Sequence, residues 1–154
     1  MNADVIGYDR NDEPFLIVEV DVSVHDDIRF DRFVARFLDM QPPLPFGIYA
    51  DLEWITLLGR DGEEGAMPLC RLDARTMLGR YDPDFRGKHS TYGTKLIFGD
   101  YLTTLVEVWL QDLAFHWKSE EPPGSSELAG TEFLRRLEGG MTKRDVTVGI
   151  APLH

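Results

Sequence analysis

The most constraining feature of the sequence is a pair of apolar segments joined by five polar residues. The first segment spans Ala3–Tyr8, and the second follows Pro14 and spans Phe15–Val22. The second is rich in β-branched residues, and its last residues alternate acid and valine, the two-residue period of a strand. Two strands joined by a short polar turn, here residues 9–13, form a hairpin. The sequence therefore predicts a β-hairpin at the start of the fold.

An amphipathic helix is predicted after the hairpin, over about Asp26–Met40. Its apolar residues recur at intervals of three and four, Asp26 and Asp27 precede them as capping residues, and Pro42 ends the helix. Further apolar or periodic segments predict strands at Phe46–Ala50, Trp54–Leu58 and Met67–Leu72, helices at 73–78, 99–117 and 131–137, and a last strand at Asp145–Ile150. This order is typical of an α/β or α+β domain.

Two segments interrupt this pattern. Residues 59–65 contain three glycines and are expected to form a mobile loop, and residues 120–126, which contain two prolines, are expected to form a linker. Neither segment is expected to divide the chain, because 154 residues suit one hydrophobic core. The sequence therefore predicts a single domain over residues 1–154.

Charge and composition limit the classes of partner. The chain carries 16 Lys and Arg against 27 Asp and Glu, a net charge of −11, which disfavours DNA as a partner because phosphates attract basic surfaces. Its apolar runs are too short for a membrane-spanning helix, and it opens without a secretory leader. It has one cysteine, Cys70, which suits a reducing compartment. A cytoplasmic protein without membrane contact is expected.

Three acids of the hairpin are the strongest candidates for chemistry. Glu19 and Asp21 are two residues apart on one strand and so share a face, and Asp4 lies on the neighbouring strand. Carboxylates that converge repel one another unless they are protonated, reach solvent or bind a cation. Mg²⁺ prefers carboxylate oxygens, so one reading is a metal site for Mg²⁺ or Mn²⁺. The other reading is that these acids form the solvated end of a strand.

The motifs that carry these acids resemble the core of the PD-(D/E)XK nuclease superfamily. The relevant segments are Asp4-Val5-Ile6-Gly7-Tyr8 and Pro14-Phe15-Leu16-Ile17-Val18-Glu19-Val20-Asp21, with further likeness at Trp109–Leu113 and Phe133–Gly140. The chain is similar to uncharacterised bacterial proteins related to the N-terminal nuclease domain of type I restriction subunits. The resemblance implies an α/β fold of the restriction-endonuclease-like kind, a mixed sheet flanked by helices. It also implies a family activity, Mg²⁺-dependent phosphodiester hydrolysis. It also implies that Asp4, Glu19 and the carbonyl of Val20 bind the metal.

The sequence departs from that family in three respects. The family has lysine where this chain has Asp21, so Asp21 would act as a third ligand or a general base if the protein is active. The family usually has a helix before the first strand, and this sequence starts three residues ahead of Asp4, so that helix is either missing or supplied by an upstream segment. Residues 1–27 hold eight acids against one base, Arg10. The sequence therefore predicts a degenerate metal-dependent nuclease-like protein. The alternative is a non-catalytic protein-interaction module or homo-oligomer on the same fold.

The remaining polar residues carry weaker signals. His25 is expected to be a capping or surface residue, His116 to stabilise the end of a helix, and Cys70 to be a structural thiol. Arginines at positions 29, 32 and 36 follow one flank of the first helix, where interleaved acids favour a solvated face.

Overall fold

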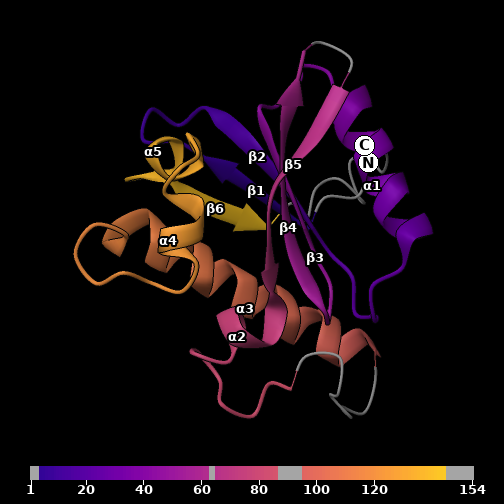
Figure 1. The fold of residues 1–154 in the computed structure, drawn as a ribbon, viewed down its shortest axis with the longest axis vertical. Helices are drawn as coiled ribbons and strands as arrows, with labels where there is room; N and C mark the ends of the chain where they lie inside the picture. Colours follow the sequence, from indigo (N-terminus) through magenta and orange to yellow (C-terminus); the bar gives the residue numbers. More distant parts are fainter. Residues whose placement is uncertain (1–3, 63–64, 87–94, 145–154) are drawn as a thin grey trace, which may run out of the picture.

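A six-stranded mixed sheet forms the centre of the protein in this computed structural model, which describes residues 4–62, 65–86 and 95–144 (Figure 1). The strands lie in the order β5-β4-β3-β2-β1-β6. Their bounds are β1 Val5–Tyr8, β2 Pro14–Val20, β3 Phe46–Ala50, β4 Trp54–Asp61, β5 Gly65–Asp73 and β6 Met141–Arg144. The helices are α1 Asp27–Asp39, α2 Ala74–Leu78, α3 Lys95–His116, α4 Ser125–Leu128 and α5 Phe133–Leu137. The predicted fold class, a mixed sheet flanked by helices, is confirmed.

The sheet is antiparallel except where β2 and β3 run side by side in the same direction. β1 and β2 form the predicted hairpin, with Val5 opposite Val18. The chain then crosses over through α1 and returns as β3, so that Val20 lies opposite Ala50. Because parallel strands end at the same edge of a sheet, the residues that follow β2 and β3 are brought together.

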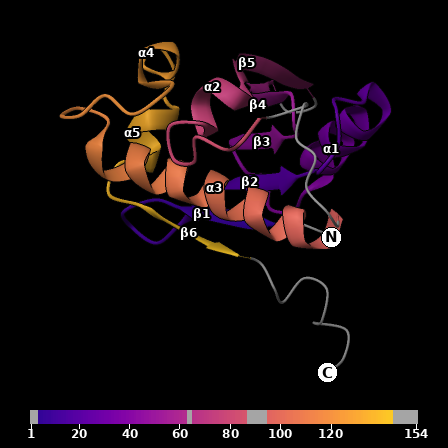
Figure 2. The same cartoon turned by 90° about the horizontal axis from the view of Figure 1, so that it is seen from below.

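Helices cover both faces of the sheet and create two apolar clusters. In β2 the side chains alternate, so Leu16 and Val18 pack with α3, whereas Ile17 packs with Phe33 and Phe37 of α1. Figure 2 shows α3 running along the sheet, and its fully buried residues include Trp109. None of the described helices combines the length and the hydropathy that crossing a bilayer requires.

The ends of the first two helices follow local capping rules. The Asp26 side chain accepts hydrogen bonds from the N–H groups of Ile28 and Arg29, as its position before the apolar pattern predicts. Asp73 does the same for Thr76 in α2. Helix α3 begins four residues earlier than the predicted Gly99, at Lys95.

Residues 59–65 are not the predicted mobile loop. β4 continues to Asp61 and β5 begins at Gly65, which lies opposite Asp61, so the described ends of this segment belong to two paired strands; residues 63 and 64 lie outside the described residues. Only Gly62, with φ of +76°, has the backbone conformation that favours glycine in a turn. Gly59 instead sits within β4, where a side chain would collide with Leu69 of β5. One glycine therefore forms a turn and another allows two strands to pack closely, and the spacing of glycines in the sequence does not distinguish these two roles.

Residues 120–126 connect α3 to α4, as predicted, but their middle part is buried rather than loose. Pro122, Pro123, Gly124 and Ser125 are buried, and α4 begins at Ser125. The Trp109 indole N–H donates to the carbonyl of Pro123 at 2.8 Å, which anchors this segment to α3. The predicted last strand, Asp145–Ile150, lies outside the described residues, and the strand beside β1 is β6, just before it.

Candidate functional site

The three candidate acids lie on the face of the sheet that α1 covers. Glu19 alternates with Ile17, which packs against that helix, and Asp21 follows the end of β2. Asp4 precedes β1, and its Oδ2 accepts a hydrogen bond from the Val20 N–H at 2.6 Å. Burial raises the pKa of the Asp4 carboxyl above its ordinary value; the Val20 N–H and Arg36 oppose this rise, and the charge of Asp21 adds to it. The hairpin therefore places the three acids in one neighbourhood.

Arginines of α1 neutralise two of these acids. Arg36 forms an ion pair with Glu19, and Arg29 Nη1 donates to both carboxylate oxygens of Asp21 at 3.1 and 3.3 Å. The two arginines are seven residues apart, two helical turns, and so project from the same face of α1. Arg29 and Arg32 are exposed, as the expected solvated face requires, and Arg36 is partly exposed. What the expectation missed is that Arg29 and Arg36 also pair with acids at the edge of the sheet. The positive charge that compensates Glu19 and Asp21 therefore comes from side chains of α1.

Tyr49 of β3 adds a second partner for Asp21. Its hydroxyl donates to Asp21 Oδ2 at 2.7 Å, and its side chain is almost fully buried. Burial and then this hydrogen bond to Asp21 raise the pKa of the Tyr49 hydroxyl far above its ordinary value, so the group is a neutral donor. Asp21 is thus held by Tyr49 and Arg29 together.

His25 belongs to the same edge of the sheet and is not a surface or capping residue. Its Nδ1 lies 2.7 Å from Oδ2 of Asp51, a carboxylate that is 0% exposed, and its own side chain is only 10% exposed. Asp51 also accepts hydrogen bonds from the N–H groups of Glu53 and Trp54 at 2.8 and 2.7 Å. This pair joins the segment after β2 to the turn after β3.

The sequence alone did not identify Tyr49 or Asp51 as members of the site. Both lie at the carboxyl end of β3, and they meet the residues after β2 because those two strands are parallel. One signal in the sequence could have indicated this meeting of residues. A predicted helix lies between two apolar strands, and a helix is the usual connection between neighbouring parallel strands. The sequence carries no comparable signal that Arg29 and Arg36 face the sheet.

The residues present do not fit a Mg²⁺ or Mn²⁺ ion in this arrangement. Such an ion needs free carboxylate oxygens, but Arg36 pairs with Oε1 of Glu19, and Arg29 and Tyr49 engage both oxygens of Asp21. Among the described residues, the only three side chains whose ligand atoms lie mutually within 4.8 Å are Asp112, His116 and Glu120.

That second group lies at the end of α3. His116 Nδ1 is 3.0 Å from Asp112 and 3.6 Å from Glu120, and the imidazole is about half exposed. A histidine near the carboxyl end of a helix, beside two acids, is stabilised by the helix dipole and by ion pairing. The group supports the predicted helix-end role of His116 and is separate from the predicted metal site.

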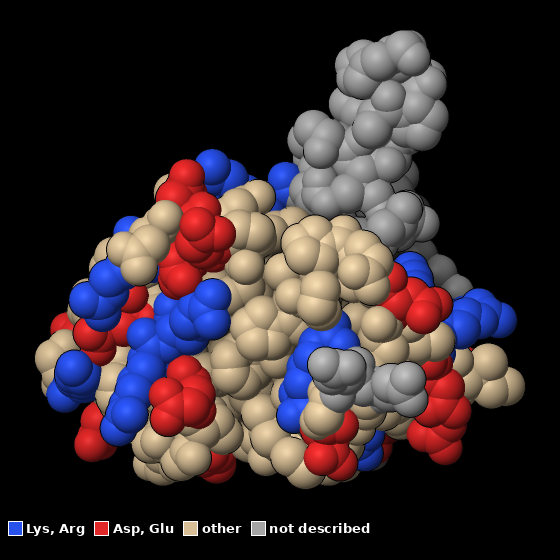
Figure 3. Space-filling model, turned by 90° about the horizontal axis from the view of Figure 1, so that it is seen from above, with Lys and Arg blue, Asp and Glu red and all other residues tan. Residues whose placement is uncertain are grey.

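Acids pair with many of the basic side chains on the surface. Figure 3 shows one face of the molecule, on which basic side chains form a band at the left and acidic side chains lie beside it. Arg10 and Arg136, for example, pair with Glu138 and Asp9. A phosphate-binding face requires basic groups that acids do not neutralise.

Comparison with known proteins adds no relative. No family model, no curated protein and no solved structure matches the chain. The candidate site is therefore defined by its own geometry.

Proposed function

We propose that the chain is a non-catalytic relative of the metal-dependent nucleases, in which arginines of α1 replace the catalytic cation. The observation that carries this proposal is the ion pair between Arg36 and Glu19. In the family that the hairpin resembles, the acid at position 19 would bind the metal. Here its charge is already compensated by the protein.

The residue at position 21 supports the same conclusion. The family's lysine would orient the attacking water and neutralise the scissile phosphate, and an aspartate reverses that charge. Arg29 and Tyr49 hold Asp21, so its carboxylate is not free to take a proton from water. The net charge of −11 acts in the same direction, because it repels a phosphate backbone.

A cleavage assay tests this proposal. Supercoiled and linear DNA would be incubated with the protein and Mg²⁺ or Mn²⁺, alongside a Glu19→Gln variant of matched purity. We expect the same background in both. Metal-dependent cleavage by the natural sequence that disappears in Glu19→Gln would overturn the proposal, because it would show that the acid still serves catalysis.

A protein-interaction module is the second candidate function, and an apolar surface favours it. Val108 and Phe115 lie seven residues apart on α3, two helical turns, and are 44% and 58% exposed. Exposed apolar groups that lie together are typical of interaction sites. Light scattering after size exclusion would report a homo-oligomer, and Phe115→Glu should convert it to the monomer. A monomer in both cases would exclude self-association through this surface.

A further inference from the structure

The end of α3 carries a histidine between two acids that lie one helical turn before and after it. Asp112, His116 and Glu120 are spaced by four residues, so their side chains follow one face of the helix. The Glu120 N–H donates to the His116 carbonyl at 2.9 Å, which continues the helical turn beyond the last residue of α3. One imidazole nitrogen and two carboxylates therefore converge at one place on the surface.

The distances between these ligand atoms suit a small tetrahedral ion. Nδ1 of His116 lies 3.0 Å from Oδ1 of Asp112 and 3.6 Å from Oε2 of Glu120. In a tetrahedral Zn²⁺ site with bonds of about 2.0–2.1 Å, neighbouring ligand atoms lie about 3.3–3.4 Å apart. The two carboxylates lie within 4.8 Å of each other, and the Glu120 side chain, which is 68% exposed, can close that distance by rotation.

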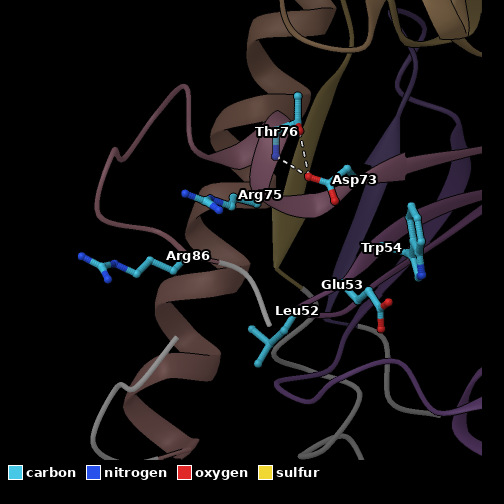
Figure 4. A pocket seen from close by; sticks show the side chains of 7 residues that line it. All are labelled: Leu52, Glu53, Trp54, Asp73, Arg75, Thr76 and Arg86. Atoms are coloured by element: carbon cyan, nitrogen blue, oxygen red, sulfur yellow. Dashed lines mark hydrogen bonds between the residues drawn. The ribbon is translucent and has the colours of Figure 1, made fainter. Parts of the chain in front are cut away.

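Asp112 is positioned by a contact from outside this group. The hydroxyl of Tyr81 donates to Oδ2 of Asp112 at 2.6 Å, which leaves Oδ1 directed at His116. Tyr81 follows α2, whose first turn is fixed by hydrogen bonds from Thr76 to the Asp73 carboxylate (Figure 4). Carboxylates that bind metal ions are usually held by such a hydrogen bond to their second oxygen.

The group has negative charge that the protein does not compensate. Among the residues that the structure describes, no lysine or arginine pairs with Asp112 or Glu120. Lys118 is the nearest basic residue in the sequence, and it pairs with Glu138 at 3.0 Å. The carboxyl end of a helix adds partial negative charge. This end of α3 therefore attracts a cation, unlike the acid site, where arginines of α1 supply the positive charge.

We propose that Asp112, His116 and Glu120 bind Zn²⁺, through Nδ1 of the imidazole and one oxygen of each carboxylate. An imidazole ligand favours zinc over Mg²⁺ and Mn²⁺, which prefer oxygen ligands. Three protein ligands leave the fourth tetrahedral position to water. The ion would fasten the turn after α3 to the helix. This assignment does not depend on the proposed function, because it uses none of the residues of the acid site.

Titration calorimetry of the full, untagged chain with zinc chloride tests the assignment. We expect one ion per chain with a dissociation constant of about 10 µM or below, weaker than a buried four-ligand site because these ligands are exposed. Mg²⁺ and Mn²⁺ should bind at least about a hundredfold more weakly. Saturating zinc should also raise the melting temperature, because the ion binds the folded chain.

Three variants locate the binding site. His116→Gln and Glu120→Gln should each weaken zinc binding by about tenfold or more, since loss of a ligand costs at least as much as loss of a group that supports one. Glu121→Gln is the matched control, because it removes the same charge one position further along the chain, from a residue outside the group. It should keep the affinity of the natural protein.

Four results would overturn the assignment. One is the absence of saturable zinc binding up to about 1 mM, and another is binding of Mg²⁺ as tight as that of zinc. A third is unchanged zinc affinity in His116→Gln, which would place the ion elsewhere. The fourth is an equal loss of affinity in Glu120→Gln and Glu121→Gln, which would reduce the effect to surface charge.

Discussion

At the scale of single residues, the acid site shows that two arginines serve where a cation was expected. Repulsion among Asp4, Glu19 and Asp21 is relieved by guanidinium groups that α1 brings to the sheet. The sequence allowed the acids to be located because strand alternation puts positions 19 and 21 on one face. It did not allow their partners to be located, because a helix flank of arginines and acids has the same pattern whether it faces water or a sheet.

Removing Arg36 should create a metal site where none is expected in the natural protein. In Arg36→Gln the Glu19 carboxylate loses its ion-pair partner and becomes available to Mg²⁺ or Mn²⁺. At a metal concentration tenfold above the dissociation constant, binding should stabilise the variant by about 1.4 kcal/mol. Thermal denaturation with and without metal measures this. The natural protein and Arg32→Gln should show no such rise, and an equal rise in all three would contradict the expectation.

Asp4 should make the stability depend on pH in a defined direction. Because burial raises the pKa of its carboxyl in the folded state, the fold favours the protonated form. The contribution of Asp4 is thus fully present at acidic pH, below the pKa of the unfolded chain. It is lost as the pH rises through the higher pKa of the folded state.

An Asp4→Asn variant isolates this effect, because an amide keeps the acceptor for the Val20 N–H without the charge. We expect the variant to be more stable than the natural protein at pH 7, and the difference to shrink at pH 3.5. Urea denaturation at the two pH values gives both free energies of unfolding. The measured quantity is the free energy of unfolding of Asp4→Asn minus that of the natural protein. If this difference were smaller at pH 7 than at pH 3.5, the expected direction of the pH dependence would be wrong.

At the scale of elements, the predictions succeeded where the signal is local. Helix α1 follows from its period and its Asp26 cap, and β3 has the predicted bounds, because neither depends on distant residues. The loop at 59–65 was mispredicted because glycine marks both turns and close approaches, and only the pairing of β4 with β5 separates them. The buried segment at Pro123 depends on Trp109, which is distant in sequence.

The longer β4 gives Arg60 a structural role that a loop would not. It donates to the carbonyls of Phe37 and Leu44 at 2.9 and 2.7 Å, and lies 4.4 Å from the centre of the Phe37 ring. It therefore holds the end of α1 against the sheet. Arg60→Gln should lower the free energy of unfolding by about 1–3 kcal/mol, measured by urea denaturation. Arg32→Gln should change it little, and equal losses in the two variants would exclude this role.

At the scale of the whole molecule, the fold class was predictable from the sequence, and the composition of the candidate site was only partly so. The alternation of strands and helices is enough to predict a mixed α/β domain. The candidate site required the parallel pairing of β2 with β3, which brings His25 to Asp51 across 26 positions of sequence. Charge balance was predictable in total but not in its distribution, which sets Arg29 and Arg36 of α1 beside Asp21 and Glu19.

Strand β6 should be essential to the stability of the sheet. It pairs with β1, and Arg144 at its end forms ion pairs with Glu107 and Asp100 of α3. A chain that stops after Gly140 would leave β1 as an unpaired edge, which promotes aggregation. We expect a large loss of soluble yield and of melting temperature. Arg144→Gln, which keeps the strand but not its ion pairs, should lose much less; equal loss in both would contradict a role for the pairing itself.

Since β1 lies between β2 and β6, its hydrogen bonds cannot be completed until position 144 has left the ribosome. Throughout translation the nascent chain therefore exposes one edge of its earliest hairpin. Any chaperone that protects this protein during synthesis would be most useful at that edge. A slow codon placed shortly before β6 would prolong the time during which the edge of β1 is unpaired.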